Sequence, residues 1–121
     1  EIIDHVTKNK INNIKIKWNK KNSITIVLCA KGYPLNYIKD SEIKNLSKIL
    51  IDKNNQIFHA GTYEKNKKIF SNGGRVLNIT VLAKNLNYAR KEALKIIKEI
   101  DWSDGFFRKD IGWKVIKSKK L

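Results

Sequence analysis

The sequence predicts an α+β domain with a mainly antiparallel sheet and one main helix, because short strand-like segments precede a single long segment of helical periodicity. The helix is expected over about residues 86–100, with Asn85 as its N-cap and lysines on its outer side. Its apolar stripe consists of Leu86, Ala89, Ala93, Ile97 and Ile100. A chain of 121 residues is long enough to bury a core around these elements.

Several strands are expected on the N-terminal side of this helix. Residues 23–30 are apolar on both faces of a two-residue period, which predicts a central strand that is covered on both sides. Residues 14–18 alternate like a half-exposed strand, and residues 56–63 form a further strand. Residues 41–50 fit either a short helical turn or an irregular packed loop. Four phenylalanines are expected in the core, namely Phe58, Phe70, Phe106 and Phe107.

The two ends of the chain carry weaker patterns. Residues 1–8 have helical spacing and look like the last turns of a helix whose start is missing. Residues 9–13 and 19–22 are polar breaks, so the compact domain is expected to begin near residue 21. Residues 114–121 form a basic tail that is expected to fray.

The segment 71–83 joins two glycines to a strand. Its residues Leu77, Ile79, Val81 and Ala83 share one face, which is expected to lie in the core. The segment 67–70 also alternates, so we expect a hairpin in which Gly73 and Gly74 adopt positive φ. Such a turn exposes backbone N–H groups beside Arg75 and would suit an anion. The alternative is a plain turn beside a solvated arginine.

The charge of the chain is strongly positive. The formal net charge is +15, which is typical of proteins that bind nucleic acid or anionic surfaces. Only three of the 26 basic residues are arginines, and lysine, asparagine and isoleucine are frequent along the whole chain. An AT-rich coding sequence favours these three residue types, so we interpret much of the charge as solvated surface. No nucleic-acid partner is expected, although a free-standing basic nucleic-acid-binding module remains the alternative function.

Several kinds of chemistry find no support in the sequence. Cys29 is the only cysteine, so no internal disulfide can form, and an inert buried thiol is expected. His5 and His59 have no ligand neighbours at zinc spacing, and His59 is expected to be packed and hydrogen-bonded. There is no phosphate-binding glycine loop, nucleophile elbow, signal peptide or membrane-spanning run. A cytoplasmic protein without a membrane partner is expected.

Four ordered segments carry a family resemblance. They are residues 27–34, 58–62, 71–77 and 107–113, which read VLCAKGYP, FHAGT, SNGGRVL and FRKDIGW. With these segments the chain resembles, over about residues 21–116, the C-terminal domain of the phosphoribosylamine–glycine ligases, or glycinamide ribonucleotide synthetases, of the ATP-grasp superfamily. Leu35 and Cys29 stand where the family usually has Gly and Ala, and Ser71 stands where Thr is common.

The resemblance implies a fold and an activity. It implies a C-terminal domain of the rudimentary hybrid-motif or barrel-sandwich type over residues 21–121. Residues 1–20 would be the end of the preceding ATP-grasp domain and a linker. It implies a ligase that joins 5-phosphoribosylamine to glycine with ATP and Mg²⁺ or Mn²⁺, in the second step of de novo purine biosynthesis. It further implies that ATP converts the glycine carboxylate to an acyl phosphate, from which the amine displaces phosphate.

The resemblance also implies where substrates are bound. Most ATP contacts and the metal ligands would lie outside this chain, so no catalytic or metal-binding residue is expected in it, and the chain should be inactive by itself. The chain would pack on the rest of its ligase, help to close the active site, and help to hold the phosphorylated ribose. The candidate substrate-binding residues are Arg75, Asn72, Gly73, Gly74 and Lys31. Arg108 and Asp110 are interpreted as an ion pair that holds the closing segment.

Overall fold

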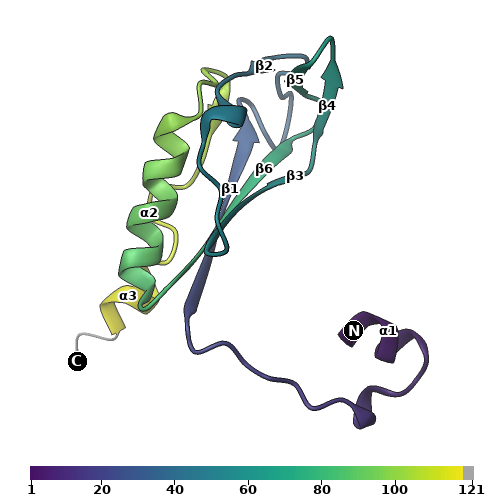
Figure 1. Ribbon diagram of the computed structural model, residues 1–121. Helices are drawn as coiled ribbons and strands as arrows, with labels where there is room; N and C mark the ends of the chain where they lie inside the picture. The colour runs from purple at the N-terminus through teal and green to yellow at the C-terminus, as the bar shows by residue number, and fades with distance from the viewer. Residues whose placement is uncertain (119–121) are drawn as a thin grey trace.

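Two antiparallel sheets and one long helix make up the body of the protein. The structure is a computed structural model that describes residues 1–118. Helix α2 covers one face of the larger sheet, the smaller sheet lies beyond the end of the larger one, and the first 21 residues leave the body as an arm (Figure 1). The α+β class with antiparallel sheets and one main helix is therefore confirmed.

The larger sheet has the strand order β3-β6-β1-β7. Its central pair is β1 (Asn22–Ala30) and β6 (Arg75–Ala83), which lie antiparallel from the Asn22–Ala83 pair to the Leu28–Leu77 pair. The edge strands are β3 (Asn55–His59) and the two-residue β7 (Gly105–Phe106). The central strands are long because both carry β-branched and leucine side chains on every second residue.

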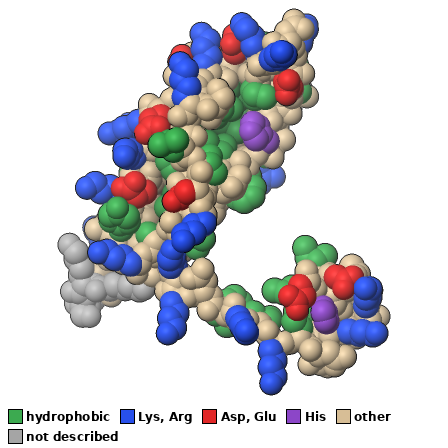
Figure 2. Space-filling model, in the orientation of Figure 1, with side chains coloured by type: hydrophobic (Ala, Val, Ile, Leu, Met, Phe, Trp, Pro, Cys, Tyr) green, Lys and Arg blue, Asp and Glu red, His purple; other side chains and the backbone are tan. Residues whose placement is uncertain are grey.

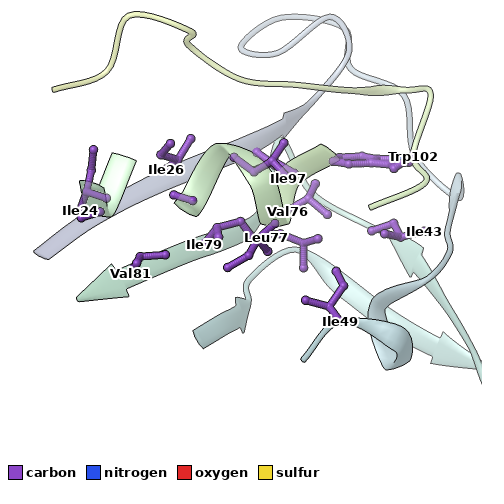
Figure 3. Close-up of a cluster of buried hydrophobic side chains, with 14 of the residues drawn as sticks. Ile24, Ile26, Ile43, Ile49, Val76, Leu77, Ile79, Val81, Ile97 and Trp102 are labelled. Atoms are coloured by element: carbon purple, nitrogen blue, oxygen red, sulfur yellow. The ribbon is translucent and has the colours of Figure 1, made fainter. Parts of the chain in front are cut away.

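Helix α2 (Leu86–Glu99) confirms the helix predicted from the periodicity. Its N-cap is Asn85, whose side-chain oxygen accepts a hydrogen bond of 2.8 Å from the Tyr88 N–H. Ala89 and Ala93 are fully buried, and such small side chains let the helix lie close to the sheet. The core beneath it is formed by side chains of β1, β6 and α2 (Figure 3). These are Ile24, Ile26, Leu28, Leu77, Ile79, Val81, Ile96 and Ile97.

The opposite face of the larger sheet is open. Val27, Phe58 and Phe106 on this side are 36%, 51% and 41% exposed. The prediction that residues 23–30 are covered on both faces is therefore wrong for the described residues, because a single helix can cover only one face. Phe58 and Phe106 are likewise not core residues, whereas Phe70 and Phe107 are half-buried.

The smaller sheet corrects the predicted hairpin. Its strands are β2 (Glu42–Ile43), β4 (Thr62–Lys65) and β5 (Lys68–Ser71), in the order β2-β5-β4. The tight turn joins β4 to β5 at Asn66 and Lys67, whose φ angles are 52° and 60°. Strands β5 and β6 lie in different sheets, and neither Gly73 nor Gly74 has positive φ. The double glycine is therefore a passage between sheets, not a hairpin turn.

Strands β3–β4 and β5–β6 form one long hairpin that is bent in the middle. The single strand predicted over residues 56–63 is interrupted at the bend. Here the Gly61 N–H donates to Arg75 O at 3.0 Å, and the Asn72 N–H donates to Gly61 O at 2.8 Å. A Cβ on Gly61 would lie 2.7 Å from the Gly73 Cα and 2.8 Å from Arg75 O. The two glycines thus allow two backbones to touch.

A hydrogen-bonded cluster joins the two sheets near this bend. Ser71 is fully buried, and its backbone N–H donates to Ser41 O at 2.9 Å. The Ser41 hydroxyl donates to Asp104 Oδ2 at 2.7 Å and accepts from Trp102 Nε1 at 3.2 Å. Trp102 is only 8% exposed, so its indole N–H needs this partner. Next to the cluster, residues 41–50 combine the short strand β2 with the 3₁₀ turn η2 (Leu46–Lys48).

The two ends of the chain differ in part from expectation. Helix α1 (Ile2–Thr7) confirms helical structure in residues 1–8, and the 3₁₀ turn η1 (Ile11–Asn13) follows it. Residues 14–18 are not a strand, because no described strand pairs with them. No residue before Asn22 is buried, and Trp18 is 85% exposed.

At the C-terminus, helix α3 (Trp113–Ser118) forms where the first part of the tail was predicted to fray. The rest of the predicted tail, residues 119–121, lies outside the described residues. None of the helices in the described chain is long and apolar enough to cross a membrane.

The close backbone contact at the bend predicts that a single methyl group added to Gly61 will strongly lower stability. Gly61→Ala should lower the free energy of unfolding by about 1–3 kcal/mol, because the new Cβ meets backbone atoms that cannot rotate away. Urea unfolding followed by tryptophan fluorescence measures the change. Ala60→Ser is the matched control, since it adds one atom at the exposed neighbouring position and should have little effect. Equal midpoints for the two variants would contradict the account of the bend.

Candidate functional site

A pocket of about 500 Å³ lies on the open side of the larger sheet. It is formed where β1, β3 and β6 end and where the loop after β1 folds over them. The lining residues are Val27, Tyr33, Tyr37, Ala60, Gly74, Arg75 and Asn78. Its volume is in the range of small-molecule sites in proteins. Within the described chain, Arg75 is the only charged residue that lines it.

A β-bulge directs Arg75 toward this pocket. Leu28 pairs with Leu77, but the next residue, Cys29, pairs with Arg75, so that Val76 is an extra residue in β6. Val76 and Leu77 are both fully buried. In a regular strand, Arg75 would share the core-facing side of β6 with Leu77, because the two residues are two positions apart. Because the bulge accommodates Val76, Arg75 instead lies on the open side next to Cys29.

Arg75 and Cys29 are electrostatically coupled. Partial burial raises the pKa of the Cys29 thiol, and the nearby positive charge of Arg75 acts in the opposite direction. The thiol is half-buried and not enclosed in the core as expected. A raised pKa agrees with the predicted lack of reactivity, because the thiolate is the nucleophilic form.

Gly74 is needed for the contact between the start of β6 and the loop that follows β1. The Ala30 N–H donates to Gly74 O at 2.9 Å, and the Tyr33 N–H donates to Ala30 O at 3.0 Å. These bonds place the Tyr33 ring directly against Gly74, where any Cβ would overlap the ring. Tyr37 continues the aromatic side of the pocket, with its ring centroid 6.4 Å from that of Tyr33.

The pocket contains only part of the predicted site. Arg75 and Gly74 line it. Gly73 instead packs on Gly61, and Asn72 is exposed beside the bend. Lys31 is exposed, and its backbone N–H donates to Asp104 O at 2.7 Å. Neither Asn72 nor Lys31 is among the lining residues.

Five of the lining residues were not predicted from the sequence as site residues, namely Val27, Tyr33, Tyr37, Ala60 and Asn78. Val27 and Tyr33 lie in the resembling segment 27–34 and Ala60 lies in the segment 58–62, so these segments were the available signal. The contact between Tyr33 and Gly74 joins two of the four resembling segments in one place.

Other polar groups lie outside the pocket. Arg108 and Asp110 form the predicted ion pair at 2.9 Å, and this contact lowers the pKa of the Asp110 carboxyl. His59 is exposed and not packed, although its Nδ1 is hydrogen-bonded to Thr62 Oγ1 at 3.0 Å. No group of three or more His, Cys, Asp or Glu side chains in residues 1–118 is placed to hold a metal ion.

The basic residues do not form one concentrated patch on the visible face. Figure 2 shows Lys and Arg side chains spread along the left side, the top and the arm of this face, with acidic side chains between them. A groove of about 710 Å³ beside α2 has both lysines and acidic residues along it. The three ion pairs found in the described residues are exposed. This distribution is that of a solvated charged surface.

The fold has a counterpart in a solved ligase. The crystal structure of phosphoribosylamine–glycine ligase from Thermotoga maritima matches 91% of this chain with a TM-score of 0.69 and 26% sequence identity. The match covers 27% of that chain. The fold is thus that of one domain of an enzyme of this class.

Sequence comparison identifies which domain it is. A family model described as phosphoribosylglycinamide synthetase, C domain, matches residues 23–114, and the chain belongs to this family. Phosphoribosylamine–glycine ligase from Brucella melitensis is 36% identical over 98% of the chain, and the one from Fusobacterium nucleatum is 42% identical over 92%. The chain spans about a quarter of the length of these relatives, 28% and 26% respectively. The resemblance found in the sequence is confirmed.

The coupling of Arg75 to Cys29 gives a direct test of the site geometry. Arg75→Gln should raise the pKa of the Cys29 thiol further, because the positive charge that opposes the effect of burial is removed. Alkylation of Cys29 by iodoacetamide should then become slower at a fixed mildly alkaline pH. The rate is measured over a range of pH, with Arg108→Gln as the control that leaves it unchanged. A faster reaction in Arg75→Gln would refute the placement of the guanidinium.

Proposed function

We propose that this chain is the C-terminal part of a ligase that joins 5-phosphoribosylamine and glycine with ATP. The products would be glycinamide ribonucleotide, ADP and phosphate, in the second step of de novo purine biosynthesis. The observation that carries the proposal is the family match over residues 23–114, together with relatives named phosphoribosylamine–glycine ligase. The cellular location that goes with this role is the cytoplasm.

In this proposal the pocket beside Arg75 receives the phosphate of 5-phosphoribosylamine. A guanidinium can bind a phosphate through two parallel hydrogen bonds, and no lining residue in the described chain is acidic and would repel it. Gly73 and Gly74 contribute by fixing the backbone on which Arg75 lies. Asn72 and Lys31 act from outside the pocket, Asn72 at the bend and Lys31 through its positive charge.

The remaining functions are assigned to the part of the ligase outside this chain. ATP, glycine and Mg²⁺ or Mn²⁺ would be bound there, since the described residues offer no cluster of metal ligands and the sequence has no phosphate-binding loop. Residues 1–20 are proposed to be the end of the preceding domain and a linker. The open face of the larger sheet, with its exposed Val27, Phe58 and Phe106, is suited to pack on the rest of the enzyme.

The role of Arg75 is testable in the full-length ligase. Hydrogen bonds to a charged group contribute about 1.5–3 kcal/mol, so Arg75→Ala should lower kcat/KM for 5-phosphoribosylamine by roughly tenfold to a hundredfold. The KM for ATP should stay unchanged, and Arg75→Lys should recover only part of the loss, because an ammonium lacks the two-pronged geometry. Arg108→Ala removes an arginine outside the pocket and serves as the control. Unchanged phosphoribosylamine kinetics with a lowered melting temperature would make Arg75 a structural residue.

The isolated chain should fold and yet show no turnover. Its core is complete under α2, but it is proposed to lack the ATP and metal sites. The measurement is glycine-dependent release of ADP by the 121-residue chain in the presence of 5-phosphoribosylamine and Mg²⁺, with the full-length ligase as the positive control. Circular dichroism verifies that the chain is folded. Release of ADP above background by the folded chain would contradict the proposal that the ATP and metal sites lie outside this chain.

A further inference from the structure

The aromatic side of the pocket has no role in the function proposed so far. Tyr33 and Tyr37 are both half-buried and belong to the loop of residues 31–37, which follows β1. Two backbone hydrogen bonds of 3.0 Å close this loop, from the Leu35 N–H to Gly32 O and from the Ile38 N–H to Lys31 O. Gly32 has a φ of 94°, a conformation that disfavours any residue with a Cβ. The loop is therefore held in a defined conformation over the end of the sheet.

Tyr33 is additionally fixed by its contact with Gly74. The ring lies directly on the glycine that precedes Arg75, and Tyr33 and Arg75 both line the pocket. The arrangement places a rigid apolar surface next to the single cation of the pocket.

The floor of the pocket supplies groups of another kind. Asn78 of β6 lies directly opposite Val27 of β1, and both line the pocket. The carboxamide of Asn78 can donate and accept hydrogen bonds. The described lining residues thus comprise one cation, one amide, two phenol rings and apolar surface, without a carboxylate. This combination matches an anionic group attached to a polyhydroxylated ring.

We infer that Tyr33 makes this pocket selective for a phosphorylated sugar over a free phosphate. Arg75 binds the phosphate, the face of Tyr33 covers the C–H side of the sugar ring, and Asn78 hydrogen-bonds to sugar hydroxyls. The negatively polarised face of an aromatic ring attracts the C–H bonds of a sugar, whereas a free phosphate gains nothing from it. The inference rests on the proposed function, since it uses the same site, and it adds the residue that recognises the sugar.

The test separates sugar recognition from phosphate binding. The folded 121-residue chain is titrated calorimetrically with ribose 5-phosphate and with inorganic phosphate, and the ratio of the two dissociation constants gives the sugar preference. The wild type should bind ribose 5-phosphate more tightly. Tyr33→Leu should reduce this preference by about threefold to tenfold and leave the affinity for phosphate unchanged. Tyr33→Phe keeps the ring and should keep the preference.

Two further variants make the outcome unambiguous. Tyr88→Leu changes an exposed tyrosine of α2, outside the pocket, and should behave as the wild type. Arg75→Ala should weaken both ligands equally; if it weakens neither, the proposed phosphate role of Arg75 fails. If ribose 5-phosphate does not bind to the folded wild type, or binds no better than phosphate, the inference is overturned. It is also overturned if Tyr33→Leu retains the sugar preference while its melting temperature shows that it is folded.

Discussion

Gly61 and Gly73 meet backbone to backbone where the long hairpin passes from the larger sheet to the smaller one. A Cβ on Gly61 would come within 2.8 Å of two backbone atoms, so the crossing exists only because no side chain separates the two segments. The hydrogen bonds from Gly61 N–H to Arg75 O and from Asn72 N–H to Gly61 O depend on this approach. On one side of the crossing the hairpin belongs to the helix-covered sheet, and on the other it pairs with β2. The position of Arg75 beside the pocket follows from the same contact.

Local periodicity was sufficient to predict much of the fold. Helix α2, its N-cap Asn85, and the strands around residues 23–30 and 75–83 were predicted because each pattern is determined by its own neighbours in sequence. The two glycines were misinterpreted for a physical reason. Glycine is required both for positive φ and for close backbone approach, and the sequence of residues 71–75 does not distinguish the two. A turn was expected at residues 64–66, but the hairpin was assigned to the double glycine because the turn at Asn66 and Lys67 contains no glycine.

The candidate site was predictable only in part, because it is made by contacts between distant segments. Arg75 stood out as a cation beside a double glycine, but nothing local indicates that the ring of Tyr33 lies on Gly74, some forty residues later in the chain. The exposure of Phe58 and Phe106 was missed for a related reason. Hydrophobicity indicates that a side chain will be covered, but not whether the covering partner lies within the described chain.

The bulge at Val76 has a consequence for which changes of chain length this domain can accept. Along a strand, successive side chains alternate in direction, and one additional residue reverses the order for all residues on one side of it. The bulge prevents this reversal, because it accommodates Val76 as an extra buried residue. Deletion of Val76 would place Arg75 directly before Leu77 and still opposite Cys29, so Arg75 would stay on the open side while the core would lose an apolar side chain. Between the double glycine and Leu77, the loss of one residue therefore affects the core and not the direction of Arg75. A lineage could therefore lose the bulge and keep the cation of the pocket, at the cost of packing beneath α2.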